Sequence, residues 1–481
     1  MDSQEQNSSY RQILKYTSLF GSIQGINILI ALVRNKIVAV LLGPSVMGLM
    51  SLFYSTIQMM FNATNLGIGT SSVKTLSELV DQGEEERLVR HVGVIRSWAM
   101  LTAIGGMLVS MLLVPLLSRM SFSDGNHELH LFLLTPAVAL MAIAGGEMAV
   151  LKATRQLKNI ARFSMLNMAF TLLAALLLFY FIGEAAIVPY LVSVALAQMV
   201  LTMIYSVRLY PYRLSFSGSV LREGKPMVKL GLAFVAAGVC TSGADFAIRA
   251  ILNKVASLEV VGLYNSGVMM TVVYAGMVFS AFETDFFPRL SQVNQRVDES
   301  NLLVNRQIEV TMHILSPMLI VFSMGMPLFL PLLFSRQFLP VLSMIQVTTL
   351  SMFIRGVKLP AAYLMLGKGD SRAFFWMELY SAVVLVLAVV GGYLLWGLVG
   401  TGIGILLTEA LDILVVNVLC RLRYHYQVST QVMRAALFHL PLQVLCLFST
   451  QFLSDISYWA AGLVLFVISL WISLHFFFTQ K

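Results

Sequence analysis

Long apolar segments, separated by short polar connectors, follow one another along the whole chain. A membrane-spanning helix needs about 20 consecutive and mostly apolar residues, and a window of that length finds fourteen such segments. We expect spans near residues 15–43, 45–70, 91–117, 129–151, 160–182, 185–208, 226–252, 258–282, 308–334, 340–366, 371–396, 398–420, 434–453 and 456–478. The hydrophobic pattern therefore predicts an all-α, polytopic membrane protein with about 14 transmembrane helices.

The composition agrees with a membrane protein. Charged residues make up 12% of the 481 residues, against about 25% in an ordinary soluble domain. Hydrophobic residues make up 58%, and the mean hydropathy is +0.81. The three cysteines lie in apolar segments without the spacing of disulfides or metal ligands, so we expect buried side chains at Cys240, Cys420 and Cys446. We expect neither a metal site nor a cofactor.

The positive charges predict how the chain is oriented in the membrane. The first apolar segment is too long for the core of a signal peptide and lacks a small-residue cleavage site, so we expect it to remain as the first helix. With the N-terminus inside, only Arg119, Lys254 and Arg336 of the 32 Lys and Arg residues fall in outer loops, and five more fall within spans. The others lie on the inner side, which predicts that both termini are cytoplasmic. The net charge of +8 is therefore a topology signal rather than a sign of nucleic-acid binding.

Two pairs of similar segments indicate an internal repeat. The stretch "VMGLMSLFYS" at residues 46–55 matches "VVGLYNSGVM" at 260–269 with an offset of 214. The linker "ATRQLKN" matches "MLGKGDSR" with an offset of 213, which aligns Arg155 with Lys368. A repeat of six spans predicts two parallel lobes, at 1–210 and 226–421, around a central cavity. The helix pair at 434–478 lies outside this repeat.

Polar and charged residues form stripes within three of the spans. A charge at the centre of a membrane helix costs about 2.5–3.5 kcal/mol on insertion scales, so such residues usually face a partner or a watery cavity. Residues three, four or seven apart share one face of a helix. The three stripes are Gln24, Asn27 and Arg34; Ser242, Asp245, Arg249 and Asn253; and Thr348, Ser351, Arg355 and Lys358.

We interpret these stripes as the lining of a polar cavity. Lys36 lies near the first stripe, and for Lys36 and Arg249 snorkelling towards a helix end is an open alternative. Asp245 and Arg249 could also pair with each other. Arg355 and Lys358 have no acid within reach along their own helix. For Glu147 and Asp412, structural pairing and proton coupling both stay open.

The candidate cavity is predicted to be positive, from Arg34, Lys36, Arg355 and Lys358. Positive charge within low-dielectric walls attracts anions, and arginine binds phosphate oxygens through two parallel hydrogen bonds. We therefore expect an anionic substrate that keeps contact with the membrane. Catalysis is not expected, because the chain has no P-loop, no H-E-x-x-H motif and no polar segment long enough to fold as a domain. The run "GTGIG" at 400–404 is interpreted as a site of close helix packing.

Three segments carry a resemblance to a known family. They are "KYTSLFGSIQGINILIALVRNKIVAVLLGPSVMGLMSLFYSTIQMMFNATNLGIG", "LKATRQLKNIARFSMLN" and "DFAIRAILNKVASLEVVGLYNSG". Together they resemble Wzx-type O-antigen flippases, which are polysaccharide transporters of the MOP (multidrug/oligosaccharidyl-lipid/polysaccharide) exporter superfamily. The resemblance covers roughly residues 11–420. It departs from the family in helix number, because Wzx transporters commonly have twelve.

The resemblance implies a function. Wzx flippases move undecaprenyl-diphosphate-linked oligosaccharides to the outer leaflet of the bacterial inner membrane by alternating access between two six-helix lobes. The implied partners are this lipid-linked substrate and membrane lipids, with polysaccharide assembly proteins as further candidates. In the related lipid II flippases a basic residue in the segment matching "RNKIVAVLLG" faces the diphosphate, and this role carries over to Arg34 alone.

Two other classes of function compete with a flippase. An ion-coupled multidrug antiporter of the same superfamily would need a cavity rich in carboxylates. A membrane-embedded polysaccharide polymerase or glycosyltransferase would normally need a large outer loop, which the span pattern does not leave room for.

Overall fold

The computed structural model describes residues 3–122, 127–273, 279, 286–287, 289–293 and 295–479, with the side chains of 3–26, 28 and 233–234 left aside. The described residues form helices and no strands. The first part of the chain holds α1 (Ser3–Thr64), α2 (Ile68–Gln82), α3 (Glu85–Ser121), α4 (Glu128–Ala153), α5 (Leu157–Phe181), η1 (Gly183–Ala186), α6 (Ile187–Val207) and α7 (Gly218–Val255). The rest holds α8 (Leu258–Val268), η2 (Met269–Val273), α10 (Val297–Leu333), η3 (Arg336–Val341), α11 (Leu342–Gly367), α12 (Ser371–Tyr424), α13 (Thr430–Phe452) and α14 (Asp455–Thr479).

Two of these helices each contain two membrane spans. The helix α1 breaks at Gly43, whose φ of 72° suits glycine, and Pro44 follows it without a backbone donor. The helix α12 breaks at Trp396 and Gly397, where Gly397 has a φ of 60°, without a proline after it. Eleven helical segments within the described residues are long and apolar enough to cross a membrane. With α1 and α12 divided, and with the shorter apolar helix Leu258–Val273, they account for the fourteen predicted spans. Residues 274–278 and 280–285, in which the eighth span was expected to end, lie outside the described residues.

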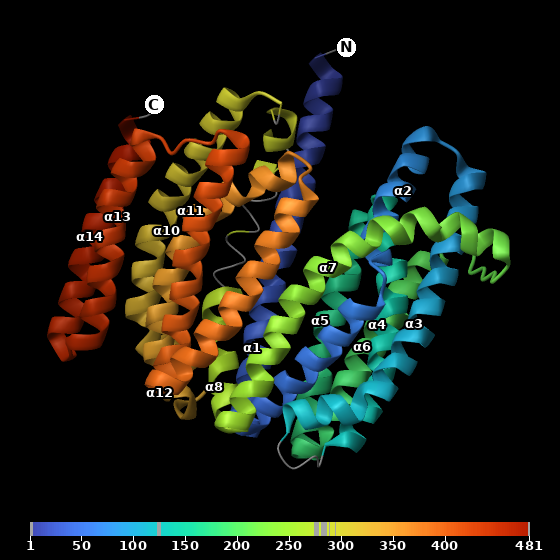
Figure 1. Ribbon diagram of the computed structural model, residues 1–481, viewed down its shortest axis with the longest axis horizontal. Coiled ribbons are helices and arrows are strands. Elements are labelled where there is room, and N and C mark those ends of the chain that lie inside the picture. The colour runs from blue at the N-terminus through green and yellow to red at the C-terminus, as the bar shows by residue number, and fades with distance from the viewer. Residues whose placement is uncertain are drawn as a thin grey trace. The chain divides into compact units, whose positions relative to one another are not determined.

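The chain divides into two compact units, Met1–Phe246 and Ala247–Lys481. In the first unit α4 packs against α3 and α6, and α1 packs against α5 (Figure 1). In the second unit α11 packs against α10 and α12 (Figure 1). The boundary between the units lies within α7. The predicted lobes at 1–210 and 226–421 stay a prediction.

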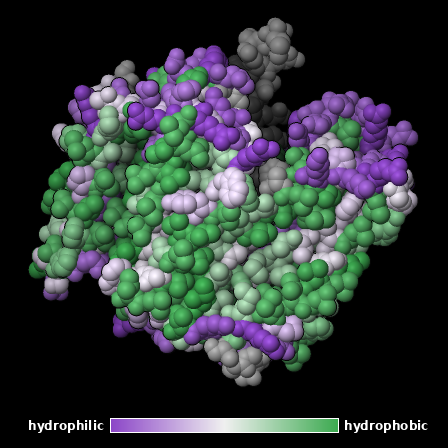
Figure 2. Space-filling model, in the orientation of Figure 1, coloured by the Kyte–Doolittle hydropathy of each residue, from purple (hydrophilic) through white to green (hydrophobic). Residues whose placement is uncertain are grey.

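The surface of each unit is that of a membrane protein. Large apolar side chains are exposed along the helices, among them Leu112, Leu395 and Trp471. Hydrophobic residues cover the middle of the helices, and hydrophilic residues gather at the helix ends (Figure 2). Such a surface would be unstable in water but suits hydrocarbon, where helices satisfy their own backbone hydrogen bonds. The protein is therefore a multi-pass membrane protein.

Helix ends and turns repeat along the chain with a spacing of 214 residues. The starts of α4 and α11, the ends of these helices, and the starts of α5 and α12 are each 214 residues apart. The left-handed residues Arg155 and Gly369 have the same spacing, and so do Gly183 and Gly397. The structure thus aligns Arg155 with Gly369, one position away from the alignment with Lys368 that the sequence predicts. The turns explain the shift, because a left-handed residue follows α4 and α11 at equivalent positions.

The helices α13 and α14 are attached to α10 through buried polar contacts. The rings of His439 and His313 share a hydrogen bond of 2.8 Å between Nε2 and Nδ1. The amide of Gln443 donates to the backbone oxygen of Ser316 at 2.9 Å, and Tyr458 donates to the backbone oxygen of Met324 at 2.7 Å. This helix pair is therefore an integral part of the second unit rather than a loose extension.

The two halves of α12 meet at glycines, as predicted for the "GTGIG" run. A Cβ atom at Gly400 would overlap the backbone of Gly392, and one at Gly404 would overlap the backbone of Ala388. We expect Gly400→Ala to destabilise the protein by about 1–3 kcal/mol, because two backbones in contact cannot move aside for a methyl group. Thermal melting of the purified protein in detergent measures this. The matched control is Gly391→Ala, whose added Cβ meets open space; equal melting temperatures for the two variants would contradict the prediction.

Candidate functional site

Arg34 lies inside the first membrane span, and the described residues include no ion-pair partner for it. It is nine residues before the break at Gly43, roughly 14 Å along the helix axis. Its guanidinium donates to the side-chain oxygen of Asn35 at 3.1 and 3.3 Å, and it interacts with Tyr190 of α6. In the described part of the chain no carboxylate lies within 4.0 Å of it. Arg34 is half-buried. Its hydrogen-bond partners in the described part of the chain, Asn35 and Tyr190, are neutral.

The other residues predicted to lie near Arg34 differ in their burial and in their contacts. Asn27 is buried and donates to Ser164 of α5 at 2.7 Å. Asn27 and Arg34 therefore both contact the α5–α6 side of the first unit. Lys36 is half-buried. The side chain of Gln24 lies outside the described residues.

Residues of the second predicted stripe lie on α7. Arg249 is buried, donates to the side-chain oxygen of Asn265 on α8 at 3.0 Å, and lies 6.0 Å from the centre of the Tyr264 ring. Asp245 is exposed. Ser242 is buried and donates to the backbone of its own helix.

Arg355 and Lys358 belong to a mixed ionic cluster in the second unit. The ammonium of Lys358 is 2.6 Å from Oε2 of Glu409 and 2.8 Å from Oδ2 of Asp412. Arg355 is 3.8 Å from the other oxygen of Glu409, and Ser381 donates to Asp412 at 2.7 Å. Two cations and two carboxylates give this cluster no net charge when all four are ionised.

The acids of this cluster come from a neighbouring helix. Lys358 has no acid within reach along α11, whereas Glu409 and Asp412 lie in the second half of α12 and reach Lys358 through tertiary packing. Ser351, which was predicted to share the stripe, is fully buried and donates to the backbone oxygen of Thr348 within α11. Arg355 and Lys358 thus come together with two acids, and Ser351 lies in the helix packing.

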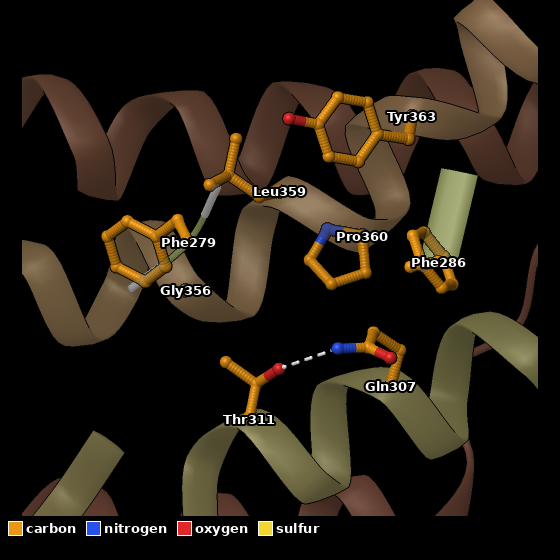
Figure 3. Close-up of a pocket in the computed structure, with 8 residues that line it drawn as sticks. All are labelled: Phe279, Phe286, Gln307, Thr311, Gly356, Leu359, Pro360 and Tyr363. Atoms are coloured by element: carbon orange, nitrogen blue, oxygen red, sulfur yellow. Dashed lines mark hydrogen bonds between the residues drawn. The ribbon is translucent and has the colours of Figure 1, made fainter. Parts of the chain in front are cut away.

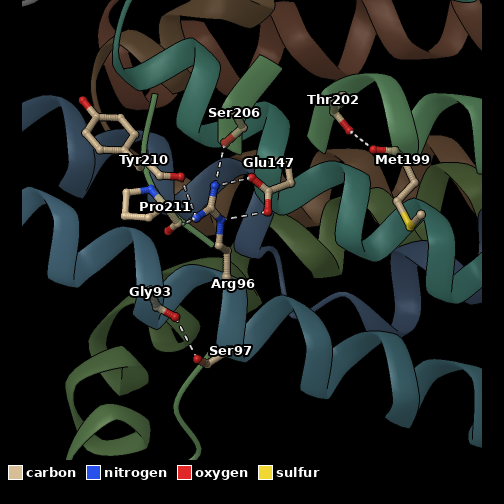
Figure 4. A network of polar contacts seen from close by, with 9 residues as sticks. All are labelled: Gly93, Arg96, Ser97, Glu147, Met199, Thr202, Ser206, Tyr210 and Pro211. Atoms are coloured by element: carbon tan, nitrogen blue, oxygen red, sulfur yellow. Dashed lines mark hydrogen bonds and ion pairs between the residues drawn. The ribbon is translucent and has the colours of Figure 1, made fainter. Parts of the chain in front are cut away.

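A second buried ion pair, which the sequence pattern did not reveal, joins Arg96 and Glu147 in the first unit. The charge pattern groups Arg96 with the inner segment before the third span. Its guanidinium donates to the two oxygens of Glu147 at 2.9 and 3.0 Å, and to the backbone oxygens of Tyr210 and Pro211 at 3.2 and 2.7 Å (Figure 4). Ser206 accepts a further hydrogen bond at 3.1 Å. Both charged side chains are 1% exposed.

This pair has a structural function. It connects α3, α4, the end of α6 and the segment after α6, and all its polar atoms face protein. Glu147, for which pairing and proton coupling were both open, is paired. The signal available in the sequence was an acid late in the fourth span together with an arginine one turn inside the third.

A small, partly open pocket lies between α10 and α11. Its lining is mostly apolar, and Gln307 donates to Thr311 at 3.3 Å on one wall (Figure 3). The cavity measures about 20 Å³, which is room for about one water molecule. It is too small to hold a substrate.

Comparisons with known proteins place the chain in a family. The sequence model of the family described as "polysaccharide biosynthesis protein" matches residues 37–343. A search of curated protein sequences finds no match. The family match covers well over half of the chain.

Solved structures with the same fold are membrane transporters. The lipid II flippase MurJ in an inward closed conformation has a TM-score of 0.74 at 11% identity, covering 96% of this chain and 99% of its own. An inward-facing multidrug resistance MATE family transporter of the MOP superfamily has a TM-score of 0.69 at 15% identity, covering 83% and 94%. A MOP superfamily transporter from Pyrococcus furiosus has a TM-score of 0.57 at 14% identity, covering 85% and 93%. The chain therefore belongs to the polysaccharide biosynthesis protein family and has the fold of MOP superfamily transporters, as its resemblance to the polysaccharide transporters of that superfamily predicts.

Proposed function

We propose that the protein is a flippase for an undecaprenyl-diphosphate-linked oligosaccharide, such as an O-antigen repeat unit. The observation that carries the proposal, together with the family, is Arg34: a half-buried guanidinium within a membrane span that has no carboxylate partner among the described residues. Arginine provides two parallel donors that match phosphate oxygens. A diphosphate would supply the negative charge that the surroundings of Arg34 lack.

In this mechanism the diphosphate crosses the membrane while bound to protein cations. The cargo enters from the cytoplasmic leaflet, pairs with Arg34, and is released outward as two six-helix lobes rock, while the polyprenyl tail stays in lipid. Tyr190 lies beside Arg34 and would hold the guanidinium in position. Lys36, two residues further along the same helix, would add positive charge. The protein would lie in the bacterial inner membrane with both termini cytoplasmic, next to the polysaccharide assembly proteins.

A multidrug antiporter is the main competing function, because MATE transporters share the fold. A cationic drug would need unpaired carboxylates within the spans. Here Glu147 is paired with Arg96, and Asp412 is paired with Lys358. The arrangement of charges therefore favours an anionic cargo. A polymerase is disfavoured by the short connections between the described helices.

Deletion of the gene in its own bacterium tests the proposal. We expect single lipid-linked repeat units to accumulate at the cytoplasmic leaflet and surface polysaccharide to disappear, with both effects reversed by a plasmid copy. A polymerase would instead leave single repeat units on the outer face. Higher sensitivity to cationic drugs with unchanged surface polysaccharide would indicate an antiporter and contradict the flippase proposal.

A further inference from the structure

The ionic cluster of α11 and α12 holds more charge than helix packing requires. The helix α11 packs along α12 (Figure 1), and the 214-residue repeat gives the equivalent helices in the first unit. The positions equivalent to Arg355, Lys358, Glu409 and Asp412 are Met141, Ala144, Ala195 and Gln198. The helices α4 and α6 pack closely with these neutral side chains. The fold can therefore join such a helix pair without charged side chains at these four positions.

The carboxylates of the cluster depend on their cations. Asp412 is 1% exposed, and its Oδ1 has no hydrogen-bond partner among the described residues. Its Oδ2 has two partners, Lys358 and Ser381. Glu409 is 10% exposed and is bound by Lys358 on one oxygen, with Arg355 near the other. A buried carboxylate that loses its cation is strongly disfavoured as a charge and takes up a proton instead.

An anion and these carboxylates must therefore compete for the same two cations. The titratable groups that the described contacts place at the cluster are Arg355 and Lys358 from α11 and Glu409 and Asp412 from α12, with Tyr380 of α12 close to Asp412. If Lys358 turns to a phosphate, Glu409 and Asp412 are left as two like charges in a poorly solvated site. Protonation of either acid removes this repulsion and frees Lys358.

We propose that Glu409 and Asp412 form a proton-binding site, and that the anionic cargo and the proton bind cooperatively through the shared Lys358 and Arg355. The inference rests on the proposed function, because it takes the diphosphate as the anion. Linkage is reciprocal: cargo binding promotes proton uptake, and a proton strengthens cargo binding. If one proton is fully coupled to binding, the cargo affinity falls about tenfold for each unit rise in pH.

Calorimetry on the purified full-length protein in detergent tests this linkage, with farnesyl diphosphate as the probe. Titrations in two buffers of different ionisation enthalpy give the number of protons taken up per probe bound. The variant E409Q/D412N keeps the shape of both side chains but cannot bind the proton. Subtracting its proton count from that of the wild type removes the contribution of the probe's own phosphates. Glu299→Gln, at an exposed acid of α10, is the matched control.

The wild type and Glu299→Gln are expected to take up about one proton more per probe than E409Q/D412N. The double variant is expected to bind the probe several-fold more tightly than the wild type at pH 8, because its cations are already free. Equal proton counts would overturn the inference, and so would weaker binding by a double variant that melts at the wild-type temperature. Absence of any probe binding to the wild type would instead overturn the proposed function, and this inference with it.

A second measurement avoids dependence on the folding of the double variant. Infrared difference spectra of the wild type, recorded on adding the probe, should gain the band of a protonated carboxyl group. The single variant Asp412→Asn should gain a weaker band. If the wild-type spectrum lacks this band at a probe concentration that saturates binding, the cluster takes up no proton. Its function would then be limited to holding α11 and α12 together, and the inference would be wrong.

Discussion

Replacing Arg34 with alanine is expected to abolish polysaccharide export while the protein remains in the membrane at its normal level. Each charge-assisted hydrogen bond to a phosphate contributes about 1.5–3 kcal/mol. Losing a single bond lowers cargo affinity about ten- to a hundred-fold, and Arg34→Ala loses both parallel bonds. The fold should tolerate the change, because no buried carboxylate depends on Arg34 in the described structure. Surface polysaccharide and protein level, measured in a strain that carries only the variant gene, check both halves of the prediction.

Two further variants separate the charge of Arg34 from its shape. Arg34→Lys keeps the charge but loses the two parallel donors, so we expect partial export. Arg119→Ala removes an exposed arginine at the end of α3 and should leave export unchanged. Normal export by Arg34→Ala would contradict the assignment of Arg34 to cargo binding, and equal loss in both alanine variants would show that the effect is not specific to this site.

Loss of Arg96 should strongly destabilise the first unit. The guanidinium makes five hydrogen bonds, and Arg96→Ile would leave Glu147 buried without a cation. Breaking one side of a buried ion pair typically costs about 3–5 kcal/mol. We expect little folded protein in the membrane and a large fall in the melting temperature of what can be purified.

The second repeat suggests the matched variant for this test. Glu147 is equivalent to Ala361 through the 214-residue spacing, and Arg96 is equivalent to Ile308 through the ends of α3 and α10, which are 212 residues apart. The double variant R96I/E147A therefore places at these two positions the apolar residues that the second repeat has at the equivalent positions. Because it leaves no buried charge, it should be more stable than Arg96→Ile alone. A double variant less stable than this single variant would show that the lost hydrogen bonds, rather than the unpaired charge, dominate.

The spans could be predicted from sequence because each depends on a local run of apolar residues. The breaks at Gly43 and Gly397 were also predictable, since the first is marked by a glycine before a proline and the second by a glycine between two apolar runs. The turn at Arg155 was misaligned by one residue, because the left-handed conformation of a non-glycine residue has no clear sequence signal. Backbone geometry resolved that alignment.

The charge partners within the membrane could not be predicted in the same way. Lys358 meets Asp412, which lies 54 residues later in the chain, and Arg96 meets Glu147 on another helix. A helical stripe shows which residues share a face but not which helix packs against that face. Arg34 was found by its position within a span. That no carboxylate of the described residues pairs with it, on which the proposed function depends, became visible only in the structure.

The most direct test of the flippase proposal is translocation by the purified protein in lipid vesicles. The vesicles carry a polyprenyl-diphosphate-linked oligosaccharide in both leaflets, and a sugar-modifying enzyme added outside reports how much of it is accessible. In protein-free vesicles only the outer-leaflet pool should react. With the wild-type protein we expect nearly the whole pool to react, and with Arg34→Ala only the outer-leaflet pool. The oligosaccharide should be the one made by the bacterium that produces this protein. If folded wild-type protein then leaves the inner-leaflet pool inaccessible to the enzyme, the flippase proposal is wrong.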